Sequence, residues 1–199
     1  MSSPTRWAGV PLTDRRAERR ALLVDAAFRL FGDGGEAALS VRSVSRECGL
    51  NTRYFYESFA DTDDLLGAVY DRVSAELGDA VEAAMADSGD SLLARTRAGM
   101  VAVLGFSSAD PRRGRVLFTD ARANPVLTAR RAATQDLLRE GVLTEGWRLH
   151  PDTDPVAAMV GAAIFTGAMA EVAQQWLAGH LGGDLDAVVC AGYPGTLAA

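Results

Sequence analysis

The sequence predicts an all-α fold of about nine helices, and three observations support this prediction. Apolar residues recur at spacings of three and four along most of the chain, which is the period of an amphipathic helix. The alternation of apolar and polar residues that marks a half-buried strand is nearly absent. Ser, Asp or Asn precedes many of the periodic segments and Gly follows several of them, as is typical of helix caps.

The composition is that of a soluble protein without a disulfide framework. Of the 199 residues, 48% are hydrophobic, and the two cysteines, Cys48 and Cys190, stand far apart in the sequence. This usage suits a reducing compartment, so we expect a cytoplasmic protein. The first residues lack the apolar core of a secretory signal. The longest apolar run, residues 156–170, is shorter than the ~20 residues that span a bilayer as a helix, so no membrane partner is expected.

Charge is distributed unevenly along the chain. The 20 basic residues are all Arg, and 26 acidic residues outnumber them, which gives a net charge of −6. Residues 1–59 nevertheless carry nine Arg against seven acids, and four of these Arg fall within residues 15–20. A basic segment in an acidic protein favours binding of a polyanion through that segment. The alternative is a solvated helix face that binds nothing.

The N-terminal part predicts one longer helix followed by two short ones. The longer helix begins near Thr13 or Asp14 and ends at a group of glycines, residues 32–35. Ser40 can cap a short helix that runs to about Cys48. After a tight turn at Gly49 and Leu50, Asn51 can cap a second short helix over residues 52–59. Two short helices joined by a turn that contains Gly predict a helix-turn-helix over residues 40–59.

The remainder predicts further helices with identifiable starts. Asp61 can cap a long helix that runs to about Met85, and Asp64 approximates a capping box with it. Other helices are expected over residues 91–106, 112–122, 126–145 and 155–181, with a loop over residues 107–111 and a final short helix capped by Asp184. Pro155 suits the first turn of the helix that begins there.

The second short helix carries the candidate contacts to DNA. Because Phe55 and Phe59 are expected to face the core, polar and aromatic residues are left on the outward side near the N-terminal end, which is the end that such helices insert into the major groove. Arg53 suits guanine, while a tyrosine hydroxyl can reach phosphate. The candidate residues are Ser40, Arg42, Asn51, Thr52, Arg53, Tyr54 and Tyr56, with Arg15, Arg16 and Arg19 of the first helix as phosphate contacts. Asn51 can equally serve only as a cap, and Glu57 is expected to face away from phosphate.

At residues 40–66, SVRSVSRECGLNTRYFYESFADTDDLL, the chain resembles the TetR family of transcriptional regulators. The resemblance extends from about residue 17 to residue 77, and its most specific elements are Val44, Gly49, Tyr56, Phe59 and the pair Leu65-Leu66. It implies an N-terminal arm together with the start of the first helix (residues 1–16), a helix-turn-helix domain (residues 17–77) and a C-terminal regulatory and dimerisation domain (residues 78–199). It also implies a homodimeric repressor that a small-molecule ligand releases from a palindromic operator.

The chain departs from the family pattern at two positions. Thr62, flanked by Asp61, Asp63 and Asp64, stands where the family usually has a Lys that helps to hold phosphate. Ser45 replaces a usual Ala, which we expect to be harmless.

The C-terminal domain offers less specific signals. Ligand pockets are lined mainly by apolar and aromatic residues. The candidate lining residues are therefore Met100, Leu104, Phe106, Phe118, Trp147 and Met159, although each also suits a core position. Small residues on the last long helix, together with the final helix, favour a dimer interface, and intrachain packing is the alternative. The interface candidates are Gly161, Ala162, Gly167, Ala168, Leu185 and Val189.

The sequence offers little support for other classes of function. Neither histidine, His150 or His180, shares a helical face with a carboxylate at metal-ligand spacing, so no metal and no cofactor is expected. An α-helical enzyme with a small apolar substrate is an alternative, but no known catalytic motif is present. A constitutive DNA-binding or adaptor protein without a ligand is a third possibility, and it would differ in lacking a cavity.

Overall fold

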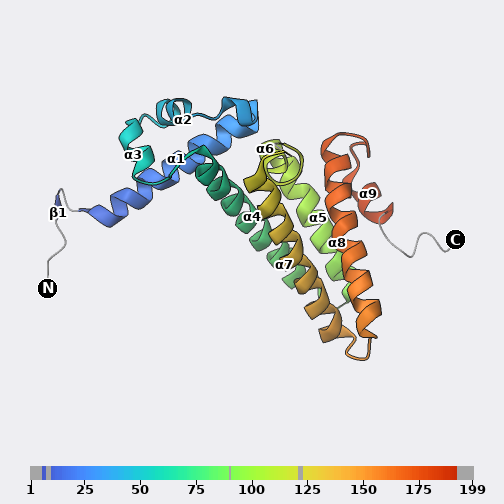
Figure 1. Ribbon diagram of the computed structural model, residues 1–199. Helices are drawn as coiled ribbons and strands as arrows, with labels where there is room; N and C mark the ends of the chain where they lie inside the picture. Colours follow the sequence, from blue (N-terminus) through green and yellow to red (C-terminus); the bar gives the residue numbers. More distant parts are fainter. Residues whose placement is uncertain (1–5, 8–9, 90, 121–122, 192–199) are drawn as a thin grey trace, which may run out of the picture.

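The computed structural model describes residues 6–7, 10–89, 91–120 and 123–191, with side chains described from residue 15 onward. Nine α-helices account for most of this part of the chain, which confirms the predicted all-α class (Figure 1). They are α1 (Leu12–Gly34), α2 (Val41–Glu47), α3 (Thr52–Tyr56), α4 (Thr62–Ala86), α5 (Leu92–Ala109), α6 (Pro111–Gly114), α7 (Pro125–Leu149), α8 (Pro155–Leu177) and α9 (Leu185–Ala191). Two short strands, β1 (Arg6–Trp7) and β2 (Val10–Pro11), pair before α1. A 3-10 turn, η1 (Glu36–Ala38), follows α1, and a π-helical segment, η2 (Arg115–Thr119), follows α6.

Most helix starts lie where the sequence places a capping side chain. The side chains of Ser40, Asn51, Asp61, Asp154 and Asp184 each accept a hydrogen bond from a backbone N–H two or three residues later, at the starts of α2, α3, α4, α8 and α9. Each bond satisfies one of the backbone donors that a helix start leaves without an intrahelical partner. The starts predicted from these capping residues are therefore confirmed.

Helix ends differ more from expectation. α8 ends at Leu177, four residues earlier than predicted, because Gly179 has φ 75° and terminates the helix there. The N–H groups of Gly179 and His180 donate to the carbonyls of Trp176 and Gln175, which is a Schellman motif. α5 instead runs on to Ala109 through the expected loop. α3 ends at Tyr56 rather than at residue 59.

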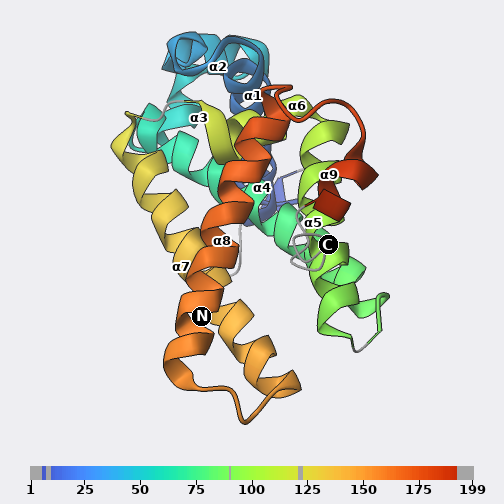
Figure 2. The same ribbon diagram turned by 90° about the vertical axis from the view of Figure 1, so that its right-hand side faces the viewer.

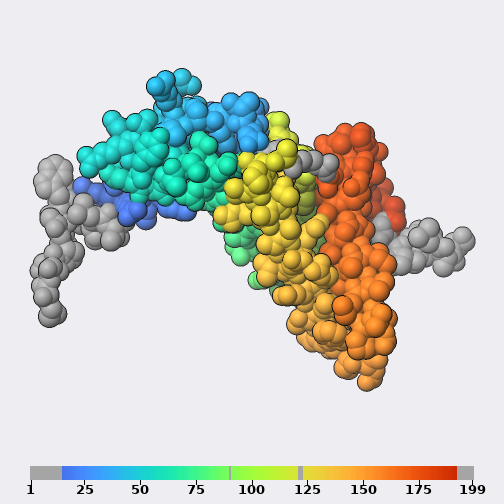
Figure 3. All heavy atoms as spheres, in the orientation of Figure 1, coloured from blue at the N-terminus to red at the C-terminus, as the bar shows by residue number. Residues whose placement is uncertain are grey.

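The helices form two packed regions joined by α4. Helices α1 to α3 lie at one end of the molecule, and α4 runs from them along α5 and α7 (Figures 1 and 3). The larger core contains Phe28, Phe31, Val44, Phe55 and Leu65, and it also takes in residues from η2 and α7. A smaller core joins α5, α8 and α9 through Met100, Leu104, Ala173 and Val189. The expected domain boundary between residues 77 and 78 lies within α4. Because α4 is continuous there, a single helix connects the two regions.

One side of α8 has no covering element among the described residues. Viewed from that side, α8 lies in front of the other helices (Figure 2). Its exposed large residues are Val156, Met159, Val160 and Ile164. α8 is the one described helix that is long and apolar enough to cross a membrane, with a mean hydropathy of 1.7 over its most apolar window, of which 17% is buried in the chain. The run of residues 156–170 seen in the sequence is thus part of a longer apolar helix.

Candidate nucleic-acid interface

Reciprocal caps and a glycine turn hold α2 and α3 in place. Ser40 and Ser43 form a capping box, in which each hydroxyl accepts a hydrogen bond from the other residue's backbone N–H. At the end of α2, Gly49 has φ 68°, and the N–H groups of Gly49 and Leu50 donate to the carbonyls of Arg46 and Ser45. This Schellman motif turns the chain sharply. Asn51 then starts α3 through a 2.9 Å bond from the Arg53 N–H to its side-chain oxygen.

The two faces of α3 are distinct. Phe55 is fully buried and contacts the ring of Phe59, which is itself buried. On the opposite side, the Arg53 side chain is 82% exposed and Tyr56 is 64% exposed. Thr52 and Asn51 are also exposed, as are Ser40 and Arg42 at the start of α2. The outward side of α3 therefore presents Thr52, Arg53 and Tyr56, as helical periodicity predicted.

Arginines of α1 lie beside this surface. The guanidinium of Arg16 donates to the backbone carbonyl of Glu57, just after α3. Arg19 lies over the ring of Tyr54 at 4.6 Å, which leaves Tyr54 half-buried rather than fully outward. Arg20 lies over the ring of Phe59 at 4.7 Å. These contacts bring the basic part of α1 against α3, so two of the predicted phosphate contacts, Arg16 and Arg19, are adjacent to the candidate base contacts. Arg15 is half-buried and also interacts with another group of the chain.

Glu57, which was expected to face away from phosphate, contacts two of these arginines. Its Oε1 accepts a hydrogen bond from Nε of Arg53 at 3.1 Å, and its Oε2 lies 3.6 Å from Nη2 of Arg19. Residues 53 and 57 are one helical turn apart, so the pair forms along the side of α3. The pairing of Glu57 with Arg19 joins two different helices, so the spacing of residues along α3 does not reveal it.

The acids that stand around Thr62 cap α4. Asp61 accepts the N–H of Asp64, and Asp64 in turn accepts the N–H of Ala60. Asp63 accepts a 3.3 Å bond from the side-chain amide of Asn124, which lies at the start of α7. Carboxylates at a helix start are favoured by the helix dipole, so these residues stabilise α4. Thr62 itself is half-buried.

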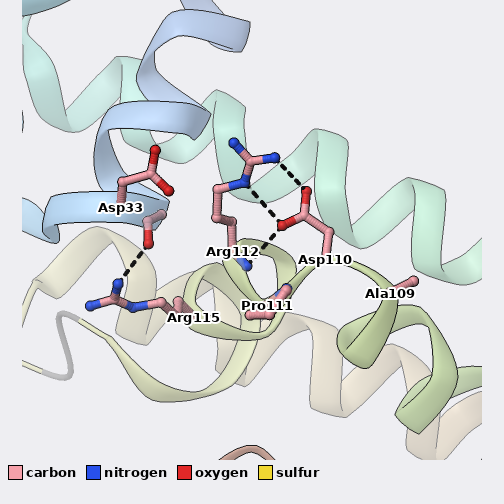
Figure 4. Close-up of a pocket in the computed structure, with 7 residues that line it drawn as sticks. Asp33, Ala109, Asp110, Pro111, Arg112 and Arg115 are labelled. Atoms are coloured by element: carbon pink, nitrogen blue, oxygen red, sulfur yellow. Dashed lines mark hydrogen bonds and ion pairs between the residues drawn. The ribbon is translucent and has the colours of Figure 1, made fainter.

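A cleft of about 590 Å³ lies where α1 ends and α6 begins, and sequence reasoning missed it (Figure 4). It is open and lined by Gly32, Asp33, Ala109, Asp110, Pro111, Arg112 and Arg115. Asp110 accepts two 3.0 Å bonds from the Arg112 guanidinium, which hold the pKa of the Asp110 carboxyl below its usual value. Arg115 donates to the carbonyl of Gly32 at 2.6 Å. The Arg115 bond joins η2 to the end of α1, whereas the Asp110 bonds lie within the first turn of α6.

The six predicted pocket residues lie in different environments. Met100 and Leu104 are buried in the smaller core, and Phe118 packs against both cores. Phe106 packs against the larger core, under the guanidinium of Arg113 at 4.3 Å. Trp147 and Met159 are exposed. The structure thus brings Met100, Leu104 and Phe118 to the smaller core, whereas Phe106 shares only the larger core with Phe118, and Trp147 and Met159 lie at the surface.

The predicted interface residues divide between the surface and the interior. Gly161, Gly167 and Ala168 are exposed on α8. Ala162 and Val189 are buried within the chain, at 2% and 0% exposure, and Leu185 packs against the smaller core. The exposed stripe of α8 includes Val156, Met159, Val160 and Ile164, which the selection of small residues overlooked. Helical spacing of these large residues was the available signal.

Clusters of three or more potential metal ligands are absent from the described part of the chain. The candidate site on α2, α3 and α1 consists of arginine, tyrosine and small polar side chains. These groups can form hydrogen bonds with phosphate oxygens and base edges.

The N-terminal part of the chain is similar in sequence to known proteins. Residues 23–69 match the family model for bacterial regulatory proteins of the tetR family. An HTH-type transcriptional repressor of Mycobacterium tuberculosis is 34% identical over 73 residues, which cover 34% of this chain and 39% of that protein. An uncharacterised HTH-type transcriptional regulator of Haemophilus influenzae is 44% identical over 59 residues, covering 29% of this chain and 28% of that protein. The chain therefore matches well under half the length of these relatives.

Similarity of fold extends over most of the chain. The crystal structure of a TetR-family transcriptional regulator from Pectobacterium atrosepticum superposes with a TM-score of 0.67 over 90% of each chain, at 24% identity. The sequence match covers the helix-turn-helix and the start of α4, while the structural match also includes the C-terminal helices. Residues 23–69 of this chain therefore resemble the tetR family of bacterial regulatory proteins, and most of the chain shares its fold with a solved TetR-family regulator.

Proposed function

We propose that this protein is a transcriptional regulator that binds operator DNA sequence-specifically through α3, as a homodimer, and that a small-molecule ligand releases it. The observation that carries the proposal is the exposed group of Thr52, Arg53 and Tyr56 on a short helix that the Asn51 cap and a buried Phe55 hold in place. Arg53 is suited to base edges, while Tyr56 and the arginines of α1 are suited to phosphate. The protein acts by binding, as a cytoplasmic repressor, rather than by catalysis.

The exposed face of α8 supports the dimer. Val156, Val160 and Ile164 follow one another at helical spacing, and the exposed Gly161 and Gly167 beside them permit close approach of a second helix. A twofold pairing of this face with itself would bury these residues and present two copies of α3 to one duplex. Such a dimer matches an operator with two inverted half-sites.

α4 supports the proposed coupling between ligand and DNA. It packs against α1 at one end and against α5 and α7 along its length. A ligand that binds more tightly to one arrangement of the C-terminal helices increases the population of that arrangement. The separation of the two α3 helices then changes to the one that this arrangement imposes through α4. Adjacent major grooves lie ~34–36 Å apart, so a small change in separation lowers affinity.

Fluorescence anisotropy tests the DNA-binding part of the proposal. The purified protein is titrated against labelled duplex DNA from upstream of its own coding region, and against a shuffled duplex of equal length, at several salt concentrations. We expect tighter binding to the upstream duplex and a steep loss of affinity with salt, because released counterions drive the phosphate contacts. Equal affinity for both duplexes at every salt concentration would contradict sequence-specific binding.

A further inference from the structure

Glu57 lies among the cationic groups that face the proposed DNA surface. Its carboxylate contacts Arg53 on α3 and Arg19 on α1, and its backbone carbonyl accepts from Arg16. A carboxylate at the C-terminal end of a helix is disfavoured by the helix dipole, which opposes the small stabilisation that the ion pair with Arg53 gives α3. The contacts of Glu57 point instead to an effect on the arginines.

The position of the carboxylate makes it a competitor of DNA. Arg53 is 82% exposed, whereas Glu57 is 35% exposed and lies between α3 and α1. A phosphate that bonds Nε of Arg53 must displace the Glu57 carboxylate, and a phosphate that bonds only the Nη groups still approaches a negative charge. Any duplex offers phosphates, so this cost applies to every sequence. At the correct base pair, a guanine edge accepts two hydrogen bonds from the guanidinium, and these bonds offset the cost of displacing the carboxylate. At other base pairs the cost is not offset.

We propose that Glu57 is a specificity-determining residue that competes with DNA phosphate for Arg53 and Arg19 and thereby weakens binding to non-operator DNA. The proposal rests on the DNA-binding function proposed above. It is a repulsive element, which raises specificity by lowering affinity for the wrong partner. Replacing the carboxylate by its neutral amide should therefore strengthen binding to random DNA more than binding to an operator.

The test compares Glu57→Gln with a matched charge control, Glu18→Gln. Glu18 is an exposed acid within the arginine-rich part of α1, so both variants remove one negative charge from the same domain. Each protein is titrated by fluorescence anisotropy against a random-sequence duplex pool and against a duplex that the wild type selects from that pool, over a range of salt concentrations. Thermal unfolding of each variant confirms that it is folded.

We expect Glu57→Gln to bind random duplex roughly threefold to fivefold more tightly than the wild type, which is the size of an exposed ion pair at its upper end. The slope of log affinity against log salt should steepen by about 0.9, as one more phosphate contact releases a counterion. Affinity for the selected duplex should rise less, so the ratio of the two affinities falls. Glu18→Gln should change the slope and the ratio much less.

A double-mutant cycle with Arg53→Gln shows whether Glu57 acts through Arg53. In the Arg53→Gln background, adding Glu57→Gln should change random-duplex affinity and salt slope much less than in the wild type, because the group for which phosphate competes has been removed. Glu57→Asp, which shortens the carboxylate arm by one methylene, should give an intermediate increase and decides the matter if Glu57→Gln does not fold.

Equal effects of Glu57→Gln and Glu18→Gln, or an unchanged affinity ratio, would overturn the role of Glu57 and leave the proposed function intact. A wild type that distinguishes no selected duplex from random DNA would instead overturn the proposed function.

Discussion

Neighbouring residues of α3 have opposite environments and therefore different roles. Phe55 is fully buried, while Arg53 and Tyr56, two residues before it and one after it, are largely exposed. The helical period predicted this division from the sequence, since Phe55 and Phe59 lie one turn apart. The pairing of Glu57 with Arg19 could not be predicted in the same way, because it depends on how α1 packs against α3. Contacts within one helix follow from sequence spacing, and contacts between helices do not.

Replacement of Arg53 by Ala tests the base contact at the residue scale. The variant should remain folded, because the side chain is exposed, and its affinity for a preferred duplex should fall by ~1–3 kcal/mol. Binding to other sequences should change less, so sequence preference is relaxed. The measurement is a set of anisotropy titrations on duplexes with single base-pair changes. A uniform loss over all of them would make Arg53 a phosphate contact instead.

The adjacent pair Phe55→Ala and Tyr56→Ala separates a core role from a surface role. Phe55→Ala should lower the free energy of unfolding by ~3–5 kcal/mol, because it removes a buried ring and leaves a cavity. Tyr56→Ala should change it by less than about 0.5 kcal/mol, as is usual for surface positions, while weakening DNA binding. Urea denaturation followed by circular dichroism measures both variants. Comparable stability losses would contradict the assigned faces of α3.

At the scale of elements, the starts of helices were predictable and their ends less so. A helix start depends on one capping side chain two or three residues away, and Ser40, Asn51 and Asp61 each supply it. A helix end depends on which of several glycines first adopts positive φ. Gly179 and Gly182 both have positive φ, and α8 ends before Gly179, although the sequence placed its end at residue 181.

Two glycines with equal space around them should respond oppositely to alanine. A β-carbon added at Gly49 or at Gly78 would meet no other group within 4 Å, but Gly49 has φ 68° whereas Gly78 is within α4. Gly49→Ala should destabilise by ~1–2 kcal/mol through left-handed backbone strain. Gly78→Ala should stabilise by ~0.8–1.0 kcal/mol through helix propensity. Chemical denaturation measures both, and stabilisation by Gly49→Ala would contradict the turn geometry.

At the scale of the whole molecule, the all-α class could be predicted, but the spatial arrangement of the C-terminal helices could not. The periodicity of each helix does not say which helix it packs against. As a result, the predicted pocket residues are distributed over two cores and the surface, with Met100 buried and Met159 exposed. The cleft between α1 and α6 was missed for the same reason, because Gly32 and Arg112 are far apart in sequence.

The exposed face of α8 predicts the effect of a single charge on assembly. Ile164→Asp should shift a dimer toward monomer, because it would bury an unpaired carboxylate at the proposed interface. Leu137→Asp is the matched control, since Leu137 is similarly exposed but lies on α7. Sedimentation velocity measures the oligomeric state of both variants. A wild type that is monomeric at all concentrations, or an Ile164→Asp variant that remains dimeric, would contradict the interface.

The most direct test of the central claim is selection of binding sites from a random duplex pool by the wild-type protein, followed by sequencing. A dimer that presents two copies of α3 to adjacent major grooves should enrich inverted repeats whose half-site centres lie about one helical turn, ~10 base pairs, apart. Enrichment of such repeats would support sequence-specific binding by a symmetric dimer. Retention of the pool without sequence enrichment would contradict it and would leave the basic surface as a non-specific polyanion site.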